Sequence, residues 1–474
     1  MRESARPRTS VLARIRDLVD LFAASSPARF AIVIFTGLVL IMTAILSLPI
    51  AAASRSATPL ADALFTAVSS ICVTGLNTVN MATHWSTFGN VVILIGLEVG
   101  GIGVLTLASM LGLIVSRRLG LRARLMAASD SNPLRIHHGP VAEGQAVRLG
   151  EIGGLLATVA ISVFTIEIVL TALITPRLLL AGSDPWHAIW EGFYFATSAF
   201  TNTGFVPHVQ GLAPFATDPW MLSVIAIGVF LGSLGFPVIF ALTKGWRTPR
   251  RWSIHVKLTL VTTLVLIVLG AIALGALEWN NPNTLGGQDP TVRPMTASFL
   301  SVMTRSGGFS TVDVGQMHGS TLLVMDMLMF VGGGSASTAG GIKVTTLAVL
   351  FLAAFAEARG DQDMQVFGRR IPSDVLRLAV SVVLWGATIV AIATIALLSV
   401  TKAPLDHVLF DVISAFGTCG LSTGVTEGLP DVGKYILAAT MWAGRVGTVT
   451  LAAALAASQR RQLFRFAEER PIVG

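Results

Sequence analysis

Eight long apolar runs constrain this chain more than any other feature. Of its 474 residues, 53% are hydrophobic and only 12% are charged, whereas a soluble domain carries about 25% charged residues. A run of about 20 apolar residues can cross the hydrocarbon core of a bilayer as a helix. We therefore expect an all-α polytopic membrane protein. Spans are predicted at 30–53, 88–115, 151–175, 219–243, 257–278, 320–350, 375–400 and 430–457.

The positive charges predict the orientation of these spans. Most of the 33 Lys and Arg residues lie in an N-terminal arm (1–29), in the connections 116–150, 244–257 and 356–377, and in a C-terminal tail (458–474). Basic residues accumulate on the cytoplasmic side of membrane proteins, so both termini are expected there. The arm lacks the apolar core and cleavage site of a signal peptide. Because the charges lie in short connections between spans, no nucleic-acid partner is expected.

A second kind of segment follows each odd-numbered span. It is too long for a turn, too short to cross the membrane, and begins near a proline, which suits the first turn of a helix. Each then continues as a half-length helical pattern and breaks at a glycine. Non-helical backbone at this depth is tolerated only where it is buried or lines a water-filled cavity, which predicts re-entrant pore loops. The segments are 58–78, 183–206, 290–311 and 403–424, with prolines at Pro59, Pro185, Pro294 and Pro404.

The four breaks recur at a spacing of roughly 100 residues, which indicates an internal repeat. One such segment alone would be an ordinary external loop with a glycine turn, but four copies at the same place in a span pair argue against that reading. We predict four tandem helix–pore loop–helix repeats, with pseudo-fourfold symmetry around one central pore. The repeats are 30–115, 151–243, 257–350 and 375–457, and the breaks are Val73-Thr74-Gly75, Asn202-Thr203-Gly204, Ser306-Gly307-Gly308 and Thr418-Cys419-Gly420.

The glycine breaks predict a cation filter. Glycine reaches backbone angles closed to other residues, so carbonyl oxygens can turn inward and replace the hydration shell of K⁺. The half helices would point their partially negative C-terminal ends at the same cavity. A single glycine motif per loop predicts few ion sites and therefore weaker selectivity, with Na⁺ entering when K⁺ is scarce. The expected ligands are the backbone carbonyls of Gly75, Gly204, Gly308 and Gly420.

The sixth span is too long for one helix and is interrupted by five glycines. Glycine, Ser and Thr hold a helix poorly, so we predict an unwound intramembrane loop at 332–343, below the filter. A phosphate-binding loop would need a Gly-Lys-Ser/Thr ending, which is absent. A helix packed through small residues is the other alternative. The candidate gating residues are Gly332, Gly333, Gly334, Ser335, Ala336, Ser337, Thr338, Ala339, Gly340, Gly341 and Lys343.

Arg445 lies in the middle of the eighth span. A charge at the bilayer centre costs roughly 2.5–3.5 kcal/mol on insertion scales and usually faces a cavity or a partner. Below a cation filter it would raise the barrier to cation passage, and it could bond carbonyls of the loop. We therefore add Arg445 to the candidate gating residues. The alternative is a structural arginine paired with an acid such as Glu98.

These motifs together resemble the Ktr/Trk/HKT superfamily of potassium transporters, most closely its KtrB-type subunits, from about residue 30 to the C-terminus. Two departures are Glu98, where a glutamine is expected, and Gly307, where an alanine is more usual. The most specific motifs are Thr304-Arg305-Ser306-Gly307-Gly308-Phe309-Ser310-Thr311, Gly235-Phe236-Pro237-Val238, the glycine-rich segment 332–343 and Gly444-Arg445-Val446-Gly447.

The resemblance implies an ion-conducting subunit of a potassium uptake system in a bacterial cytoplasmic membrane. It implies a homodimer, with the end of the tail, Glu469-Arg470-Pro471-Ile472-Val473-Gly474, packed at the dimer interface. It also implies a gating loop controlled by a cytoplasmic KtrA-type ring of RCK domains, which would bind ATP or ADP. No nucleotide-binding motif occurs in the chain itself, and no enzymatic activity is expected.

Two other classes of function compete with this prediction. A secondary active transporter, coupled to Na⁺ or H⁺, would work by alternating access and also contains repeats and broken helices. However, the repeats here number four in one orientation instead of two inverted halves. An intramembrane hydrolase could use Ser335 or Ser337, but no span offers a credible histidine.

Overall fold

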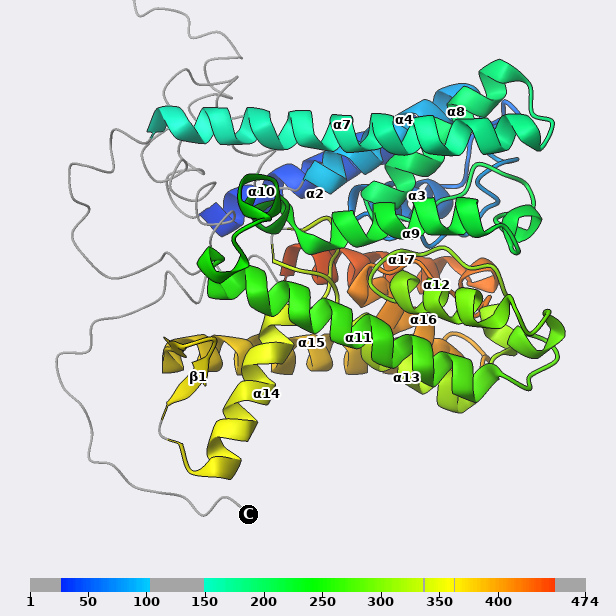
Figure 1. Ribbon diagram of the computed structural model, residues 1–474. Coiled ribbons are helices and arrows are strands. Elements are labelled where there is room, and N and C mark those ends of the chain that lie inside the picture. Colours follow the sequence, from blue (N-terminus) through cyan, green and yellow to red (C-terminus); the bar gives the residue numbers. More distant parts are fainter. Residues whose placement is uncertain (1–26, 103–148, 336, 362, 448–474) are drawn as a thin grey trace, which may run out of the picture.

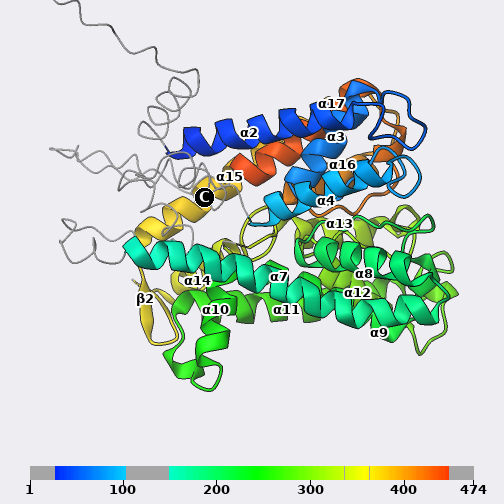
Figure 2. The same cartoon turned by 90° about the horizontal axis from the view of Figure 1, so that it is seen from above.

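The computed structural model describes residues 27–102, 149–335, 337–361 and 363–447. Four units, each with a helix, a short pore helix and a second helix, follow one another along the chain (Figure 1). In Figure 2 the first and fourth units form one half of the molecule and the second and third form the other. The first three elements of each unit are α2 (Pro27–Leu46), α3 (Leu60–Ile71) and α4 (Thr87–Ile102); α7 (Leu149–Leu180), α8 (Pro185–Phe200) and α9 (Pro219–Leu234); α11 (Ile254–Glu278), α12 (Arg293–Met303) and α13 (Gly319–Phe330); and α15 (Ser373–Leu398), α16 (Leu405–Gly417) and α17 (Asp431–Trp442).

The first helix of each unit turns apolar side chains outward. Within the described residues, α11, α15 and the part of α7 at Ala160–Leu180 are each long and apolar enough to cross a membrane. Water would penalise such exposed apolar surface, whereas a lipid tail would not. The expected all-α membrane architecture is thus confirmed. Exposed residues on these first helices include Leu40, Ile41, Ile161, Ile168, Ile272, Leu384 and Ile395.

The pore helices α3, α8, α12 and α16 are largely buried. Each begins at or within one residue of the proline that the sequence singled out. Proline fixes the first turn of a helix and lacks an N–H group that would need a partner there. In α8, Asp184 also caps the helix by accepting the N–H of Trp186 at 3.2 Å.

The second helices differ most from the predicted continuous spans. The expected span 219–243 bends by 103° between α9 and α10 (Phe236–Gly245). Gly235 has φ +87° at the bend, which ends the helix, and Pro237 lies in the first turn of the next one. The expected span 320–350 ends as α13 at Phe330 and resumes as α14 (Val344–Arg359).

Two further spans lie partly outside the described residues. The second helix of the first unit is described only as far as Ile102. In the fourth unit α17 passes into a π-helical turn, Ala443–Gly447, and π-turns often mark functional sites. Most of the arm 1–29, all of the tail 458–474, and Ala336 also lie outside the described residues.

The connection 356–377 contains one element that the all-α prediction missed. Strands β1 (Met364–Val366) and β2 (Arg369–Ile371) pair antiparallel, with Met364 opposite Ile371. Phe367 and Gly368 between them have φ angles of 51° and 72°, as a two-residue hairpin turn requires.

Gly270 lies where the first helix of the third unit, α11, packs against the pore helix α12, and a substitution there tests this packing. A Cβ there would lie 2.4 Å from Ser301 Oγ, and that hydroxyl is held by a 2.7 Å bond to the Ile267 carbonyl. We expect Gly270→Ala to lower the free energy of unfolding by about 1–3 kcal/mol through overpacking. Thermal unfolding in detergent would show this.

The matched control is Gly275→Ala on the same helix, where the new Cβ would meet only the Ala297 Cβ at 3.6 Å. That variant should be neutral or gain up to about 1 kcal/mol from helix propensity. Equal destabilisation by both changes would contradict the packing described here.

Candidate functional site

The four glycine breaks have one backbone conformation. In each, the residue two positions before the predicted filter glycine is left-handed, although it is not glycine. Such residues are uncommon and cost about 1–3 kcal/mol each, and they cluster at functional sites. The φ angles are 56°, 62°, 70° and 46° at Val73, Asn202, Ser306 and Thr418, and 91°, 83°, 73° and 94° at Gly75, Gly204, Gly308 and Gly420.

The four segments also meet in space as a closed ring. A Cβ added to a filter glycine would collide with the carbonyl oxygen of the residue that precedes the next filter glycine, and the fourth segment closes on the first. No side chain fits at these positions. The Cβ-to-oxygen distances are 1.7 Å from Gly75 to Thr203 O, 2.8 Å from Gly204 to Gly307 O, 2.8 Å from Gly308 to Cys419 O and 2.3 Å from Gly420 to Thr74 O. The Thr203 oxygen also lies 2.7 Å from the Cβ position of Gly308 and 3.1 Å from that of Gly420.

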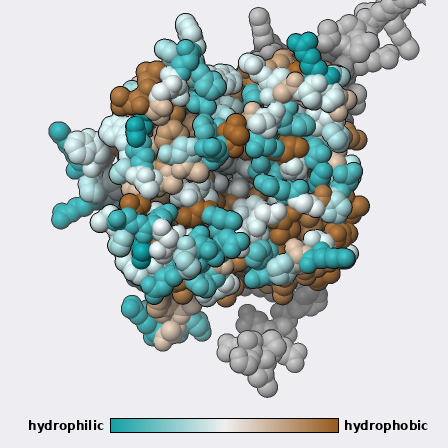
Figure 3. Space-filling model, turned by 90° about the vertical axis from the view of Figure 1, so that its right-hand side faces the viewer, coloured by the Kyte–Doolittle hydropathy of each residue, from teal (hydrophilic) through white to brown (hydrophobic). Residues whose placement is uncertain are grey.

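This ring brings together residues that are far apart in sequence. All twelve residues that were predicted to form the filter lie in these four segments. The segments bring neutral carbonyl oxygens close to one another, and such oxygens can replace the water shell of a monovalent cation. The ring lies within the half of the molecule that holds the pore helices, to the right in Figure 1. In Figure 3 the hydrophilic face at that end is hollowed near its middle.

Serine side chains, which were not among the predicted site residues, brace three of the four segments. Ser69 Oγ accepts the N–H of Gly75 at 3.1 Å and donates to the Leu76 carbonyl at 2.7 Å. Ser198 donates to the Phe205 carbonyl at 2.8 Å, and Ser414 accepts the N–H of Gly420 at 3.1 Å. The signal was available, because each serine lies six residues before its filter glycine. In the third unit Val302 has this position.

In three of the units, a glycine of the second helix packs against the end of the pore helix. In the first, second and fourth units, a Cβ on a second-helix glycine would lie 2.0–2.2 Å from a carbonyl oxygen at the end of the pore helix. In these three units, the contact fixes the position at which the segment leaves its pore helix. The pairs are Gly100 with Ile71, Gly232 with Phe200, and Gly444 with Phe416.

In the third unit the second helix is replaced at this level by the unwound segment 331–343. The Thr338 hydroxyl donates to the Phe200 carbonyl at 3.2 Å and to Asn202 Oδ1 at 2.8 Å. A Cβ on Gly340 would lie 2.2 Å from Thr418 Oγ1. The segment therefore touches the second and fourth filter segments directly, at the left-handed residues.

Arg445 joins this segment to the first unit. Its guanidinium donates to the Gly100 carbonyl at 2.6 Å and to the Thr338 carbonyl, as the loop-bonding hypothesis expected. Glu98, the acid considered as an alternative partner, accepts a 3.5 Å bond from Thr197. Lys343, which was assigned to the interior of a span, instead precedes α14 and donates to the Ala339 carbonyl at 2.7 Å.

Arg305, from the motif Thr304–Thr311, lies in the interior of the protein. It is 1% exposed, and its guanidinium donates to the carbonyls of Leu328 and Val331. These carbonyls lie where α13 ends and the unwound segment begins.

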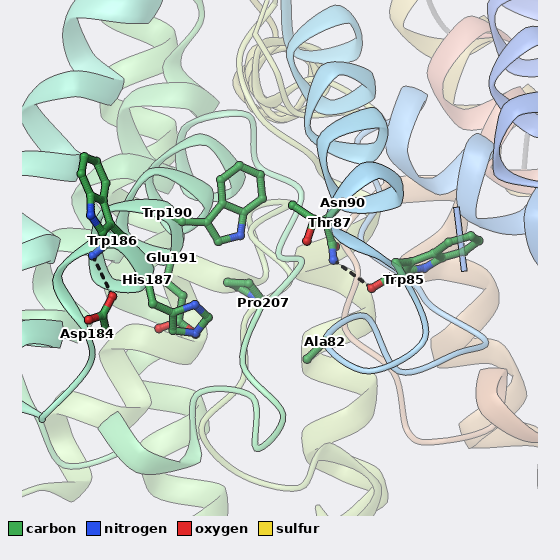
Figure 4. Close-up of a pocket in the computed structure, with 10 residues that line it drawn as sticks. All are labelled: Ala82, Trp85, Thr87, Asn90, Asp184, Trp186, His187, Trp190, Glu191 and Pro207. Carbon is green, nitrogen blue, oxygen red and sulfur yellow. Dashed lines mark hydrogen bonds and ion pairs between the residues drawn. The ribbon is translucent and has the colours of Figure 1, made fainter. Parts of the chain in front are cut away.

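An open cavity of ≈ 510 Å³ lies away from the ring, at the ends of α4 and α8 (Figure 4). Trp190 and Trp186 line it, together with a His187–Glu191 pair at 3.2 Å. Both tryptophans lie near the start of α8. Its lining includes no residue of the four filter segments.

Comparisons with known proteins agree with this geometry. The family profile described as TrkH, cation transport protein, matches residues 20–462. The chain belongs to this TrkH/Ktr family of cation transport proteins.

Two relatives from Bacillus subtilis match nearly end to end. The Ktr system potassium uptake protein D is 34% identical over 96% of this chain and 98% of its own length, and the Ktr system potassium uptake protein B is 31% identical over 94% and 97%. The potassium/sodium uptake protein NtpJ of Enterococcus hirae is 29% identical over 95% and 97%. The crystal structure of the potassium transporter TrkH from Vibrio parahaemolyticus matches with a TM-score of 0.66, at 17% identity, over 95% of this chain and 86% of that one.

The serine brace can be tested on two adjacent residues of α3. Ser69→Ala leaves the buried N–H of Gly75 and the carbonyl of Leu76 without their partner. We expect a loss of about 1–3 kcal/mol in stability and a lower discrimination between cations, measured by thermal unfolding and by competing ion fluxes. Ser70→Ala removes only a bond to the Thr66 carbonyl within the same helix. If it lowered discrimination equally, the brace would have no special role.

Proposed function

We propose that this chain is the ion-conducting membrane subunit of a potassium uptake system, in which K⁺ passes through the four-carbonyl ring as in a channel. The proposal rests on the closed ring, in which a Cβ on each filter glycine would lie within 2.8 Å of the carbonyl oxygen before the next filter glycine. A cation that leaves water needs several oxygen ligands at once, and neutral carbonyls favour a large, weakly hydrated ion. The proposed ligands are the carbonyls of this ring and of the four filter glycines.

The proposed selectivity is for K⁺ over Na⁺, but incomplete. The left-handed and glycine positions repeat once in each segment, which leaves room for few stacked rings. The names of the relatives fit this view, since the Ktr proteins are called potassium uptake proteins and NtpJ is called a potassium/sodium uptake protein.

The proposed gate is the segment 331–343, with Arg445 as part of it. The segment packs directly against two of the proposed filter segments, and we propose that an ion leaving the ring meets it. Arg445 adds a positive charge at the same place, and a like charge raises the energy of a passing cation. We propose that both move when the pore opens.

The regulatory part of the proposal rests on family membership. The relatives are named as members of a Ktr system. We propose cytoplasmic termini, a homodimer, and a cytoplasmic KtrA-type RCK ring that binds ATP or ADP. Helix α14 continues directly from the gating segment, and the hairpin β1–β2 follows it. We propose that the ring acts on these elements and that their movement is transmitted to the gate.

A secondary active transporter with alternating access is the second candidate. The 103° bend between α9 and α10 favours it, because broken helices are typical of such carriers. Turnover distinguishes the two, since a carrier must change conformation for every ion or ion pair.

The proposed function is tested with purified protein in liposomes. With an outward K⁺ gradient, we expect uptake of ⁸⁶Rb⁺ that external K⁺ suppresses more strongly than Na⁺, at rates above those of a carrier. Equal competition by Na⁺ and K⁺ would contradict the carbonyl-ring account. Flux that requires a Na⁺ or H⁺ gradient would favour the carrier.

Arg445→Gln tests the gate. The change removes the positive charge and two charge-assisted hydrogen bonds, each worth about 1.5–3 kcal/mol, so the closed state should weaken. We expect basal K⁺ flux to rise by about tenfold or more. Arg250→Gln, at an exposed arginine of a 3-10 turn, is the control and should leave flux unchanged. Unchanged or lower flux in well-folded Arg445→Gln protein would refute this role.

A further inference from the structure

Arg305 lies at the junction between a filter segment and the break in α13. It immediately precedes the left-handed residue Ser306, and Gly308 follows shortly after. It is the largest of the fully buried side chains in the described part of the chain. A buried cation is costly unless it meets suitable acceptors, and the acceptors here are backbone carbonyls.

The guanidinium replaces hydrogen bonds that an unbroken helix would make. The last carbonyls of a helix lack partners, and α13 stops at Phe330 in the interior of the protein. Arg305 donates to the carbonyl of Leu328, in the last turn, and to that of Val331, the first residue of the gating segment. A positive charge is also favourable at the negative end of a helix dipole. The side chain therefore acts as a cap across the break.

The backbone of Arg305 is tied to the filter at the same time. Its N–H donates to the Val302 carbonyl at 2.9 Å, at the end of pore helix α12. Its own carbonyl accepts from Asn202 Nδ2 at 3.4 Å. Asn202 Oδ1 in turn accepts from Thr338 in the gating segment. The third filter segment is thus linked to the gating segment at two points. One is Val331, where the gating segment begins, and the other is Thr338, in its middle, through Asn202.

We infer that Arg305 is the positioning residue that couples the filter to the gate. Its side chain holds the start of the segment 331–343 against the third filter segment, so the gate cannot leave its position without disturbing the ring of carbonyls. This inference rests on the proposed function of that segment as a gate. It gives the third unit a side chain that the other units do not have, since Cys72, Thr201 and Gly417 take the corresponding positions.

The test compares Arg305→Met, which keeps the length and loses every donor, with Arg305→Lys, which keeps the charge. Two properties are measured in liposomes: basal K⁺ flux and the K⁺/Na⁺ preference. A third is the rate at which a thiol reagent modifies Ser337→Cys in the gating segment. Ser337 is half-buried, whereas Cys72 and Cys419 are fully buried, so protein without the added cysteine supplies the blank.

We expect Arg305→Met to raise both the basal flux and the modification rate by about tenfold, and to lower the K⁺/Na⁺ preference. Arg305→Lys should change all three in the same direction but less. Arg445→Met should also raise flux and modification, because it loses the bond to Thr338 of the gating segment.

If Arg305 had a merely structural role, its substitution would lower stability but would not change both the K⁺/Na⁺ preference and the modification rate of Ser337→Cys. Folded Arg305→Met with an unaltered preference or an unaltered modification rate would overturn the inference. If that variant does not fold, the same two readouts in Arg305→Lys decide, and unchanged values there would overturn it. The thiol measurement needs no transport, so it separates this inference from the proposed function, which fails if the unaltered protein carries no K⁺.

Discussion

The contact between each filter glycine and the carbonyl of the next filter segment is the constraint on which the rest of the structure depends. Four segments from different parts of the chain approach so closely that a single Cβ at Gly75 would lie 1.7 Å from an oxygen. Only glycine leaves room for the neighbouring carbonyl oxygen at this position. Buried pore helices precede all four segments, and the serine braces and second-helix glycines hold the segments of the first, second and fourth units in place.

The repeats are equivalent in this ring but unequal beneath it. Three second helices press a glycine against the end of a pore helix, whereas the third unwinds. Two buried arginines bond the unwound segment, one from the third filter segment and one from the π-turn of the fourth unit. Selectivity is therefore proposed to be shared by all four units, while gating is assigned to the third and fourth. The second unit takes part as well, through the bond between Asn202 and Thr338.

The sequence predicted features that depend on local chemistry. Glycine at the four breaks, proline at the start of the pore helices and the glycine-rich interruption of the sixth span all act through their own backbone, so their positions could be predicted. The order of contacts around the ring could not, because it depends on packing between distant segments. For the same reason, the burial of Arg305 and the identity of the carbonyls that bond Arg445 could not be predicted from the sequence. The bend at Gly235 was missed although the Gly-Phe-Pro motif was noted, because hydropathy alone favours one continuous span.

The central claim is that the ring binds a cation. An experimental structure of the protein in Rb⁺, with anomalous diffraction to identify the ion, tests it most directly. The account predicts ion density on the common axis, within coordination distance of the carbonyls of Thr74, Thr203, Gly307 and Cys419. An empty axis at saturating Rb⁺, with transport intact, would contradict it.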